Sequence, residues 1–339
     1  MPQRFLVTGG AGYVGSHLVD LLVAGGAQVV VLDDLHQGHR ESLPPGVRLV
    51  RVNVGDKAAL DALLGADTFD AVFHLAAISL VGESMRDPLR YLRENTGNAF
   101  TLIDCCVRHG VSRFVLSSTA SLFGEERNPI AETARLEPPS PYGESKLMIE
   151  RALYWAGRAH GLRSACLRYF NAAGADPNGR LGEDHDPETH LIPLVIDAAL
   201  GRRAAITVNG SDYATPDGTC IRDYVHVTDI ASAHLLALRQ LDHGSVTYNL
   251  GSGAGHSVRE VIAAVEAISG RIVPVIEGPR RPGDAAVLVA NPDLVRVQAG
   301  WSPRWTALSD IVGTAYAWRV AHPNGYAGGH SDPNAGTAR

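Results

Sequence analysis

The chain has 339 residues, 45% hydrophobic and 19% charged, which is typical of a globular protein with one large two-part fold or two small domains. A formal net charge of −6 excludes the strongly basic surface of proteins that bind nucleic acid or anionic membranes. No uncharged apolar stretch reaches the ~20 residues of a membrane-spanning helix. The four cysteines have neither zinc-site nor disulfide-framework spacing, so we expect a soluble, cytoplasmic protein.

The first half of the chain alternates short apolar runs with helix-like segments. The apolar runs are rich in Val, Leu and Phe, as are parallel strands that are buried on both faces. This alternation predicts an α/β fold with a doubly wound parallel sheet. The expected strands are Arg4–Thr8, Gln28–Leu32, Arg48–Val52, Ala71–Leu75, Arg113–Ser117 and Ser164–Arg168, and the expected helices are Val14–Ala24, Lys57–Leu64, Pro88–His109 and Tyr142–His160.

The pattern loosens after about residue 172, where a Gly/Pro/Asp-rich loop occupies Gly174–Glu188. We expect residues 1–171 to form the main domain, with segments within 220–250 returning to its sheet. Residues 172–320 are expected to form a smaller α/β lobe that binds substrate, and residues 321–339 a disordered tail. Within the lobe and the returning segments, the expected helices are Ile192–Leu200 and Val258–Ile268, and the expected strands are Ala205–Val208, Thr247–Leu250 and Ile272–Ile276.

Glycines follow the first expected strand in a spacing suited to a dinucleotide. Gly9, Gly12 and Gly15 would supply a tight turn, close backbone approach to a pyrophosphate, and close packing of helix on strand. The following helix N-terminus would attract the phosphates. Asp33 ends the next strand, where its carboxylate could accept from ribose hydroxyls and would repel a 2′-phosphate. The sequence therefore predicts an NAD site rather than an NADP site.

A tyrosine and a lysine four residues apart mark a second candidate feature. Tyr142 and Lys146 lie at the start of an expected helix and so share one face, and Lys57 is the only other lysine of the chain. A nearby ammonium and a positive nicotinamide ring would lower the tyrosine pKa and make it a general base. Hydroxyls at Ser117–Ser121 follow the fifth strand, and Thr119 among them could bond a substrate oxygen that changes charge.

With these residues the chain resembles the extended short-chain dehydrogenase/reductases, and within them the UDP-glucose 4-epimerase family, from about residue 4 to residue 320. The likeness rests on several independent motifs in the same order. They are Gly-Gly-Ala-Gly-Tyr-Val-Gly-Ser-His (9–17), Val-Gly-Glu-Ser (81–84), Ser-Pro-Tyr-Gly-Glu-Ser-Lys-Leu (140–147), Leu-Arg-Tyr-Phe-Asn (167–171), Ile-Arg-Asp-Tyr-Val-His-Val (221–227) and Pro-Arg-Arg-Pro-Gly-Asp (279–284).

The resemblance implies a Rossmann fold, tightly bound NAD, a UDP-sugar substrate and a homodimer formed through a helix bundle. It implies Tyr142 as catalytic base, Lys146 as its pKa partner and ribose ligand, and Thr119 as the hydroxyl that bonds the sugar 4-oxygen. The implied cofactor-binding residues are Gly9, Gly12, Tyr13, Val14, Gly15, Asp33, Asn53, Val54, Leu75, Ala76, Ala77, Asn95, Ser117, Tyr142, Lys146 and Tyr169. The implied substrate-binding residues are Thr119, Tyr142, Asn171, His190, Leu191, Arg222, Arg281 and Asp284.

The implied reaction removes a hydride from C4 of the sugar, forms a 4-keto intermediate, and returns the hydride to the opposite face. Dehydratases of this family have Asp-Glu after the active-site Thr, because loss of water needs an acid and a base. Thr119 is followed here by Ala120 and Ser121, which cannot do that work, so the sequence disfavours a dehydratase. A UDP-pentose 4-epimerase stays open because it would use the same residues. A UDP-N-acetylhexosamine 4-epimerase stays open because Leu288, which aligns with the position that limits the sugar pocket, is neither bulky nor small. A non-catalytic NAD-binding regulatory module is the remaining alternative.

Four positions depart from the family pattern around the nucleotides. They are Asp34, Asn53, Ser79 and His190. Metal binding is a separate question, because Asp184-His185-Asp186 lies close in sequence to Glu188 and His190. Their spacing matches no known zinc site, so the sequence favours a polar loop and no metal.

Overall fold

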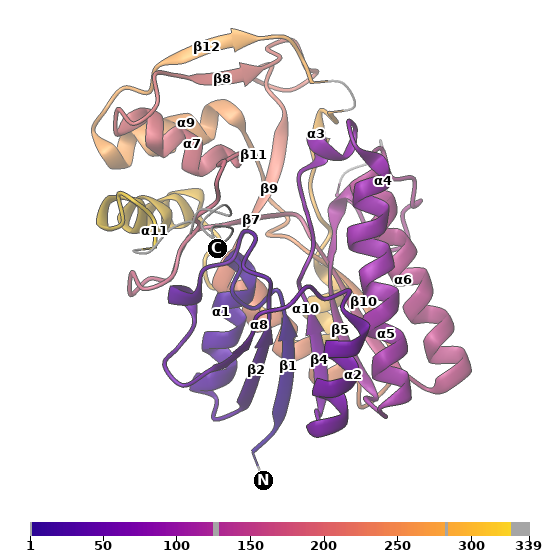
Figure 1. The fold of residues 1–339 in the computed structure, drawn as a ribbon. Coiled ribbons are helices and arrows are strands. Elements are labelled where there is room, and N and C mark those ends of the chain that lie inside the picture. Colours follow the sequence, from indigo (N-terminus) through magenta and orange to yellow (C-terminus); the bar gives the residue numbers. More distant parts are fainter. Residues whose placement is uncertain (1, 125–128, 282–283, 327–339) are drawn as a thin grey trace.

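The computed structural model describes residues 2–124, 129–281 and 284–326, and it is built around one seven-stranded parallel sheet (Figure 1). The strand order reverses between β1 and β4, which makes a switch point at the carboxyl ends of these strands. The sheet confirms the expected doubly wound fold. Its strands, in spatial order, are β10 (Val246–Leu250), β6 (Arg163–Tyr169), β5 (Arg113–Thr119), β4 (Ala71–His74), β1 (Arg4–Thr8), β2 (Gln28–Leu32) and β3 (Arg48–Val50).

The bounds of four strands of the main sheet differ from expectation at their carboxyl ends, and β6 among them is one residue longer at each end. β3 stops at Val50 because the chain turns there, with the Val52 amide donating to the Val50 carbonyl. β4 ends at His74, and the next two amides both donate to the carbonyl of Thr8 on β1. β5 continues to Thr119, which pairs in register with Tyr169 of β6. The longer β5 brings a threonine hydroxyl to the edge of the sheet where ligands bind in such folds.

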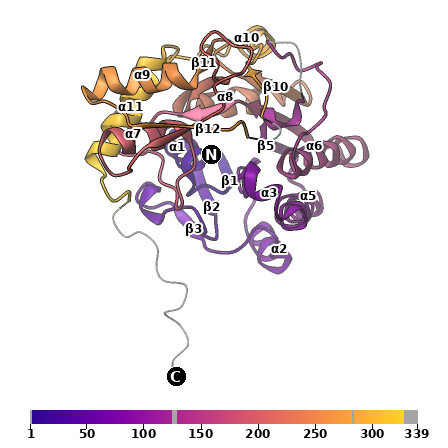
Figure 2. The same cartoon turned by 90° about the horizontal axis from the view of Figure 1, so that it is seen from above.

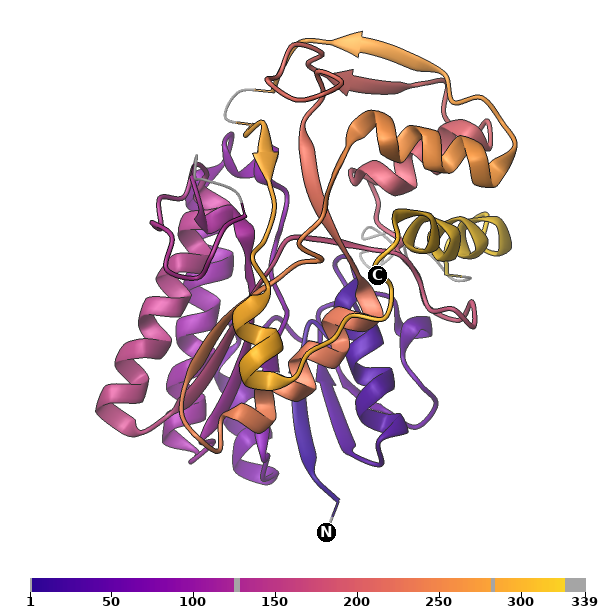
Figure 3. The same ribbon diagram turned by 180° about the vertical axis from the view of Figure 1, so that it is seen from behind.

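Helices cover both faces of the sheet (Figures 1 and 3). On one face, α1 (Tyr13–Ala24) and α8 (Val227–Gln240) pack against each other, with α10 (Asp293–Ala299) beside β10. On the other face lie α2 (Lys57–Ala66), α5 (Asn98–Arg108) and α6 (Pro141–His160). Each face has its own cluster of buried apolar side chains, as expected for strands that are buried on both sides.

The expected helix over residues 88–109 is divided into three segments. α4 (Pro88–Tyr91) leads into a π-helical segment at Leu92–Gly97, and α5 follows. The wider turn contains Asn95 and Thr96, both buried and both hydrogen-bonded to Ser145 of α6. These contacts are tertiary, so the 3.6-residue periodicity did not reveal the break.

The second lobe lies beyond the carboxyl ends of the main strands, with its helices and paired strands above the sheet in Figure 1. β9 (Ile221–His226) pairs with β7 (Asn171–Ala173), β11 (Gly255–Ser257) and β13 (Val287–Leu288), while β8 (Ile206–Asn209) pairs with β12 (Val275–Gly278). α7 (Leu191–Ala199), α9 (Val258–Ser269) and α11 (Leu308–Ala321) share an apolar core with β8 and β9. Seen from above, they lie to one side of α6 (Figure 2).

Two segments of this lobe differ from the sequence prediction. The expected strand at 272–276 begins only at Val275, because Val273 is tied to α9 by a bond from its amide to the Glu266 carboxylate. α11 was not expected, and the chain continues past it to Tyr326, which is buried and stacks near His39 and Trp318. The remainder of the expected tail, 327–339, lies outside the described residues. Within the described ranges, the helices are all too short or too polar to cross a bilayer.

Candidate active site

The glycine loop between β1 and α1 has three glycines in three different situations. Gly9 has a φ of +71°, and a Cβ there would lie 2.4 Å from the Ala76 backbone nitrogen. A Cβ on Gly15 would lie 2.0 Å from the Gly9 carbonyl oxygen. Gly12 is different: its nearest neighbour would be the Gly9 carbonyl oxygen, at an ordinary 3.5 Å. Gly9 and Gly15 are therefore required by packing inside the protein, whereas the backbone at Gly12 faces open space.

The same loop offers hydrogen-bond donors to an anion. Gly12 is the N-cap of α1 and makes no side-chain cap bond, so the first amides of the helix lack a side-chain acceptor. Tyr13 and Val14 are the first residues of this helix and are half-buried. The Tyr13 hydroxyl donates to the Gly174 carbonyl at 2.6 Å, which ties the loop to the second lobe. An uncapped helix N-terminus beside open space fits a pyrophosphate group.

Asp33 lies at the end of β2 and is buried beside this loop. Its Oδ2 accepts from the Ala11 amide at 2.9 Å and its Oδ1 from the Leu35 amide at 2.9 Å. Burial raises the pKa of the Asp33 carboxyl, and the two backbone bonds oppose that rise. The carboxylate is thus fixed in place, with each oxygen keeping capacity for a further donor.

The other expected cofactor residues surround the same edge of the sheet. Asn53 donates to Asp34 at 3.0 Å and accepts from Gly55, Val54 is buried, and Leu75, Ala76 and Ala77 follow directly after β4. The Asn95 amide instead makes three internal bonds, two with the backbone of Ile78 and one with Ser145. Asn95 therefore braces the segment after β4 against α6.

Tyr142 and Thr119 meet at the carboxyl end of β5. The Ser140 side chain accepts from the Gly143 amide and Pro141 occupies the first helical position, so α6 begins just before Tyr142. Burial raises the pKa of the Tyr142 phenol, Tyr169 adds to that rise, and a hydrogen bond with Thr119 opposes it. The lowering expected from the sequence requires a positive nicotinamide ring beside the phenol, so it stays a prediction for the NAD-bound protein.

Lys146 is 2% exposed and lies under the same edge of the sheet. Its Nζ donates to the Ser117 carbonyl at 2.9 Å. Burial lowers the pKa of Lys146 to about 8, while the charge of Glu150 opposes the fall. The Tyr169 hydroxyl donates to Ser117 Oγ at 3.1 Å, so Lys146, Ser117 and Tyr169 form one connected group next to Tyr142.

A buried ion pair that the sequence analysis did not find supports this group. Arg168 of β6 donates to both carboxylate oxygens of Glu150, at 3.0 and 2.6 Å, and the Ser118 hydroxyl donates to Glu150 as well. The two charged side chains are only 6% and 8% exposed. The pair joins α6 to β6 on the helical face that also contains Lys146. Its members lie 18 residues apart in sequence, without a short motif to indicate the contact.

Apart from Thr119 and Tyr142, the expected substrate residues come from β7, β9, the segment that ends at Asp284 and the start of α7. Asn171 begins β7, Arg222 lies on β9, and Leu288 of β13 pairs with Arg222 in register. The Arg222 guanidinium forms an ion pair with Asp284. The remaining expected residues are Arg281, exposed in the segment before Asp284, and His190 and Leu191, which open α7.

Comparison with known proteins bears directly on this arrangement. Residues 5–251 match the NAD dependent epimerase/dehydratase family. The chain belongs to this family. It is 46% identical to a protein of Halalkalibacterium halodurans named UDP-glucose 4-epimerase, over 97% of this chain and 99% of that one.

Two solved structures of family members are similar to this one throughout. The UDP-glucose 4-epimerase of Brucella ovis in complex with NAD is 43% identical, with a TM-score of 0.90 over 93% of this chain and 97% of that one. The UDP-glucose 4-epimerase of Bifidobacterium longum in complex with NAD⁺ and UDP is 33% identical, with a TM-score of 0.92 over 96% and 100%. The open backbone at Gly12, the uncapped α1 and the fixed Asp33 carboxylate fit the NAD of this family.

Proposed function

We propose that this chain is a UDP-glucose 4-epimerase, which interconverts UDP-glucose and UDP-galactose with tightly bound NAD. One observation supports this above the others. The Tyr142 phenol lies near enough to Thr119 for that hydroxyl to act on its pKa, with Lys146 one helical turn away, beside a glycine loop that fits a dinucleotide. A proton acceptor, a hydroxyl partner and a cofactor site at one sheet edge are what oxidation of a sugar hydroxyl requires.

In the proposed mechanism, bound NAD supplies the hydride acceptor and donor at C4 of the sugar, with a 4-keto sugar between the two transfers. Tyr142 takes the proton of the 4-hydroxyl as general base and returns it at the end. Thr119 donates to the sugar 4-oxygen or to Tyr142 and so stabilises charge there. Lys146 holds the nicotinamide ribose, with its ammonium oriented by the Ser117 carbonyl.

The substrate side of the proposal rests on donors in the second lobe. Asn171, Arg222 and Arg281 are assigned to the diphosphate, because arginine can bind phosphate oxygens through paired N–H groups. Asp284 is assigned to the uridine ribose, which requires its ion pair with Arg222 to rearrange when substrate binds. His190 and Leu191 are assigned to the uracil end of the pocket. An anchor at the nucleotide leaves the sugar free to rotate between the two hydride transfers.

The domains are assigned by the ligand that each part of the chain is proposed to bind. We assign residues 1–171 to NAD binding and residues 172–320 mainly to the UDP-sugar, with the segment that forms β10 returning to the main sheet. The four cysteines are free, and free buried thiols are usual in a reducing compartment, so we assign the protein to the cytoplasm.

We also propose a homodimer formed through α5 and α6. Large apolar side chains are exposed on these helices: Phe100 is 46% exposed, Tyr154 58% and Trp155 65%. Exposed aromatic side chains gathered on neighbouring helices are typical of subunit interfaces. Light scattering should give twice the chain mass for the natural protein and one chain mass for Trp155→Arg.

The direct test of the function is an assay with UDP-galactose and no added NAD. We expect UDP-glucose to form, because the net redox change is zero and the resident cofactor need not exchange. UDP-N-acetylglucosamine and UDP-xylose, assayed side by side, should turn over more slowly. If UDP-galactose is unchanged even with NAD added, the proposed function is wrong, and faster turnover of another sugar would reassign the substrate.

Gly12 offers a test of the cofactor site that is separate from folding. Gly12→Val should fold, because its φ of −77° suits any residue and the nearest atom is 3.5 Å from the added Cβ. The branched side chain would occupy the space assigned to the pyrophosphate, so the purified variant should contain little NAD. Bound NAD is measured by absorbance after acid release, and folding by circular dichroism.

The matched change at Gly9 should impair folding, which the change at Gly12 should leave intact. Gly9→Val places a Cβ 2.4 Å from backbone at a positive φ, so this variant should lose thermal stability. A Gly12→Val protein that retains a full equivalent of NAD would contradict the assigned pyrophosphate position.

Thr119 should set the pH dependence of the reaction. Its hydrogen bond lowers the pKa of Tyr142, so Thr119→Val should raise that pKa further. A general base acts in its deprotonated form, and a higher pKa leaves less of that form at neutral pH. We therefore expect the rise of kcat with pH to move to higher pH in Thr119→Val. Ser121→Ala, which keeps the Thr119 hydroxyl, should retain the natural pH profile, and an unshifted Thr119→Val profile would refute this role.

A further inference from the structure

The loop between β7 and α7 brings together four side chains that can bind metal. Glu183, His185, Glu188 and His190 each offer one ligand atom, and the four atoms all lie within 4.8 Å of one another. His190 Nδ1 hydrogen-bonds to Glu183 Oε1, and His185 Nδ1 lies 3.4 Å from the same oxygen. The sequence analysis favoured a plain polar loop here, because the residues match no zinc-site spacing. The fold of the loop, rather than its spacing, makes the cluster.

Glu188 has one carboxylate oxygen without a hydrogen-bond partner among the described residues. Its Oε1 accepts from the Thr189 amide at 2.7 Å and from the His190 amide at 2.9 Å, which fixes the carboxylate. Its Oε2 is buried and accepts no hydrogen bond from the described residues. The closest charged partner recorded for this oxygen is His185 Nδ1, 3.8 Å away, which is too far for a hydrogen bond. The Glu188 side chain is only 8% exposed, so this oxygen is a buried acceptor that can still take a water or a metal ion.

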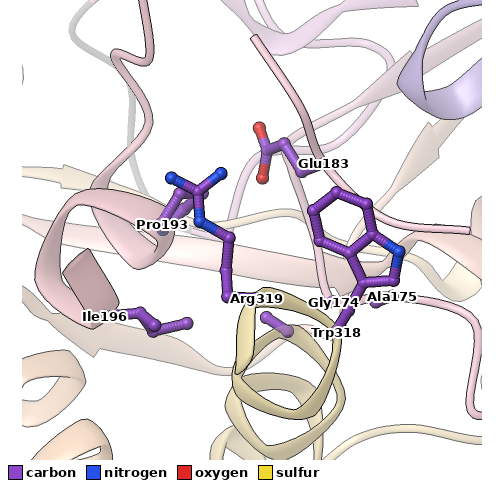
Figure 4. Close-up of a pocket in the computed structure, with 8 residues that line it drawn as sticks. Gly174, Ala175, Glu183, Pro193, Ile196, Trp318 and Arg319 are labelled. Atoms are coloured by element: carbon purple, nitrogen blue, oxygen red, sulfur yellow. The ribbon is translucent and has the colours of Figure 1, made fainter. Parts of the chain in front are cut away.

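Within the described residues, the charged contacts recorded for the two glutamates come from His185 and His190 alone. Arg319 of α11 faces Glu183 across a small cavity lined also by Trp318 and residues of α7 (Figure 4), but its guanidinium is bound to Asp197. Asp184, the acidic neighbour in the loop, lies against His39. The charges of Glu183 and Glu188 also help to raise the pKa of the buried Tyr13 phenol.

We propose that Glu183, His185, Glu188 and His190 together bind one divalent transition-metal ion of the zinc class. Two imidazole nitrogens with two carboxylate oxygens form a set that suits Zn²⁺, Co²⁺ or Ni²⁺, whereas Mg²⁺ and Ca²⁺ prefer oxygen ligands alone. Tetrahedral zinc with bonds of ~2.1 Å places neighbouring ligand atoms ~3.4 Å apart. Small side-chain movements within the observed spread of 4.8 Å would reach that geometry.

The place of the ion in the fold indicates what it would do. The same loop is held to the main domain by a bond from the Gln37 side chain to the Asp186 carbonyl at 2.9 Å. Tyr13 of α1 donates to Gly174 at the other end of the loop. An ion at the cluster would cross-link the middle of this loop to the first turn of α7. It would therefore stabilise the segment that joins the two lobes, without a part in the hydride transfer.

The test is metal binding by the full-length protein after treatment with EDTA. We expect equilibrium dialysis with Zn²⁺ to give one ion per chain, and Co²⁺ to give the visible absorption of a tetrahedral site. Zn²⁺ at about 100 times its Kd should raise Tm by roughly 5 °C. These measurements do not depend on activity, so they stand apart from the proposed epimerase reaction.

The double variant His185→Asn, Glu188→Gln should lose at least about tenfold in Zn²⁺ affinity, together with the Co²⁺ spectrum and the Tm shift. His243→Asn with Glu277→Gln makes the same two changes at exposed positions outside the loop and should bind metal like the natural protein. Circular dichroism of the metal-free variants checks folding, and the single change Glu188→Gln serves if the double variant is unfolded. Equal Zn²⁺ binding by the natural protein and the loop variants, or no binding by the natural protein, would overturn the proposal.

Discussion

Replacing Tyr142 with phenylalanine is expected to lower kcat by about 10²–10⁴-fold, the usual contribution of general base assistance. The phenol is the group placed to take the proton, and it lies near Thr119 at the end of β5. Phenylalanine keeps the ring and loses only the hydroxyl, so the half-buried position should still fold. The measurement is kcat with UDP-galactose, together with the NAD content of the purified variant.

The NAD content separates loss of chemistry from loss of the cofactor. Tyr142→Phe should keep about one NAD per chain, because the glycine loop and Asp33 are untouched. The control is Tyr154→Phe, which removes a hydroxyl from an exposed tyrosine of the same helix and should leave kcat unchanged. If Tyr142→Phe turns over at a rate close to that of the natural protein, another residue is the base.

The alternation of apolar strands with helices made the main sheet predictable from sequence. The six strands expected before residue 172 are present, because strands buried on both faces need continuous apolar runs. Glycine positions were equally informative, since the chain cannot place a Cβ at Gly9 or Gly15. These are local or strongly patterned signals. Each can be read from a short window of the chain.

The pKa values and the supporting contacts were not predictable in this way. A Tyr-x-x-x-Lys spacing places two side chains on one helical face. It does not show which backbone carbonyl accepts a hydrogen bond from the lysine. The Ser117 carbonyl accepts this bond from Lys146. Burial is the largest influence on the pKa of Tyr142. Depth of burial depends on the whole sheet and on the second lobe. Sequence therefore placed Tyr142 and Lys146 on one helical face but did not show how deeply the two side chains are buried.

For the loop of residues 183–190, the sequence showed the residue types but not their arrangement in space. Its ligand-type residues were visible in the sequence, yet their spacing favoured an ordinary polar loop. Whether His185, Glu188 and His190 converge depends on how the loop folds over β7 and α7. Backbone bonds to Glu188 from its own neighbours fix that arrangement. Hydrogen bonds from backbone amides to a nearby glutamate carboxylate produce no periodic pattern in the sequence.

The largest effect on stability is expected at Arg168. Arg168→Met would leave the Glu150 carboxylate buried without its partner, which typically costs about 3–5 kcal/mol. The side chain of Glu150 is 8% exposed, so solvent cannot replace the guanidinium without a rearrangement of α6 against β6. The change should appear as a lower urea midpoint and a lower Tm. Methionine keeps much of the apolar contact with the Phe123 ring, so the loss reports mainly on the charge.

Two further variants separate the buried charge from the general effect of losing an arginine. Arg259→Met removes one partner of an exposed pair with Glu277, 2.7 Å apart, and should change stability by less than about 1 kcal/mol. Adding Glu150→Gln to Arg168→Met removes the unpaired charge and should recover much of the lost stability. A double variant as unstable as Arg168→Met alone would show that packing, rather than the buried carboxylate, accounts for the loss. In that case the hydrogen bonds of Arg168 and Ser118 to Glu150 would align the strands and helix without a large electrostatic contribution.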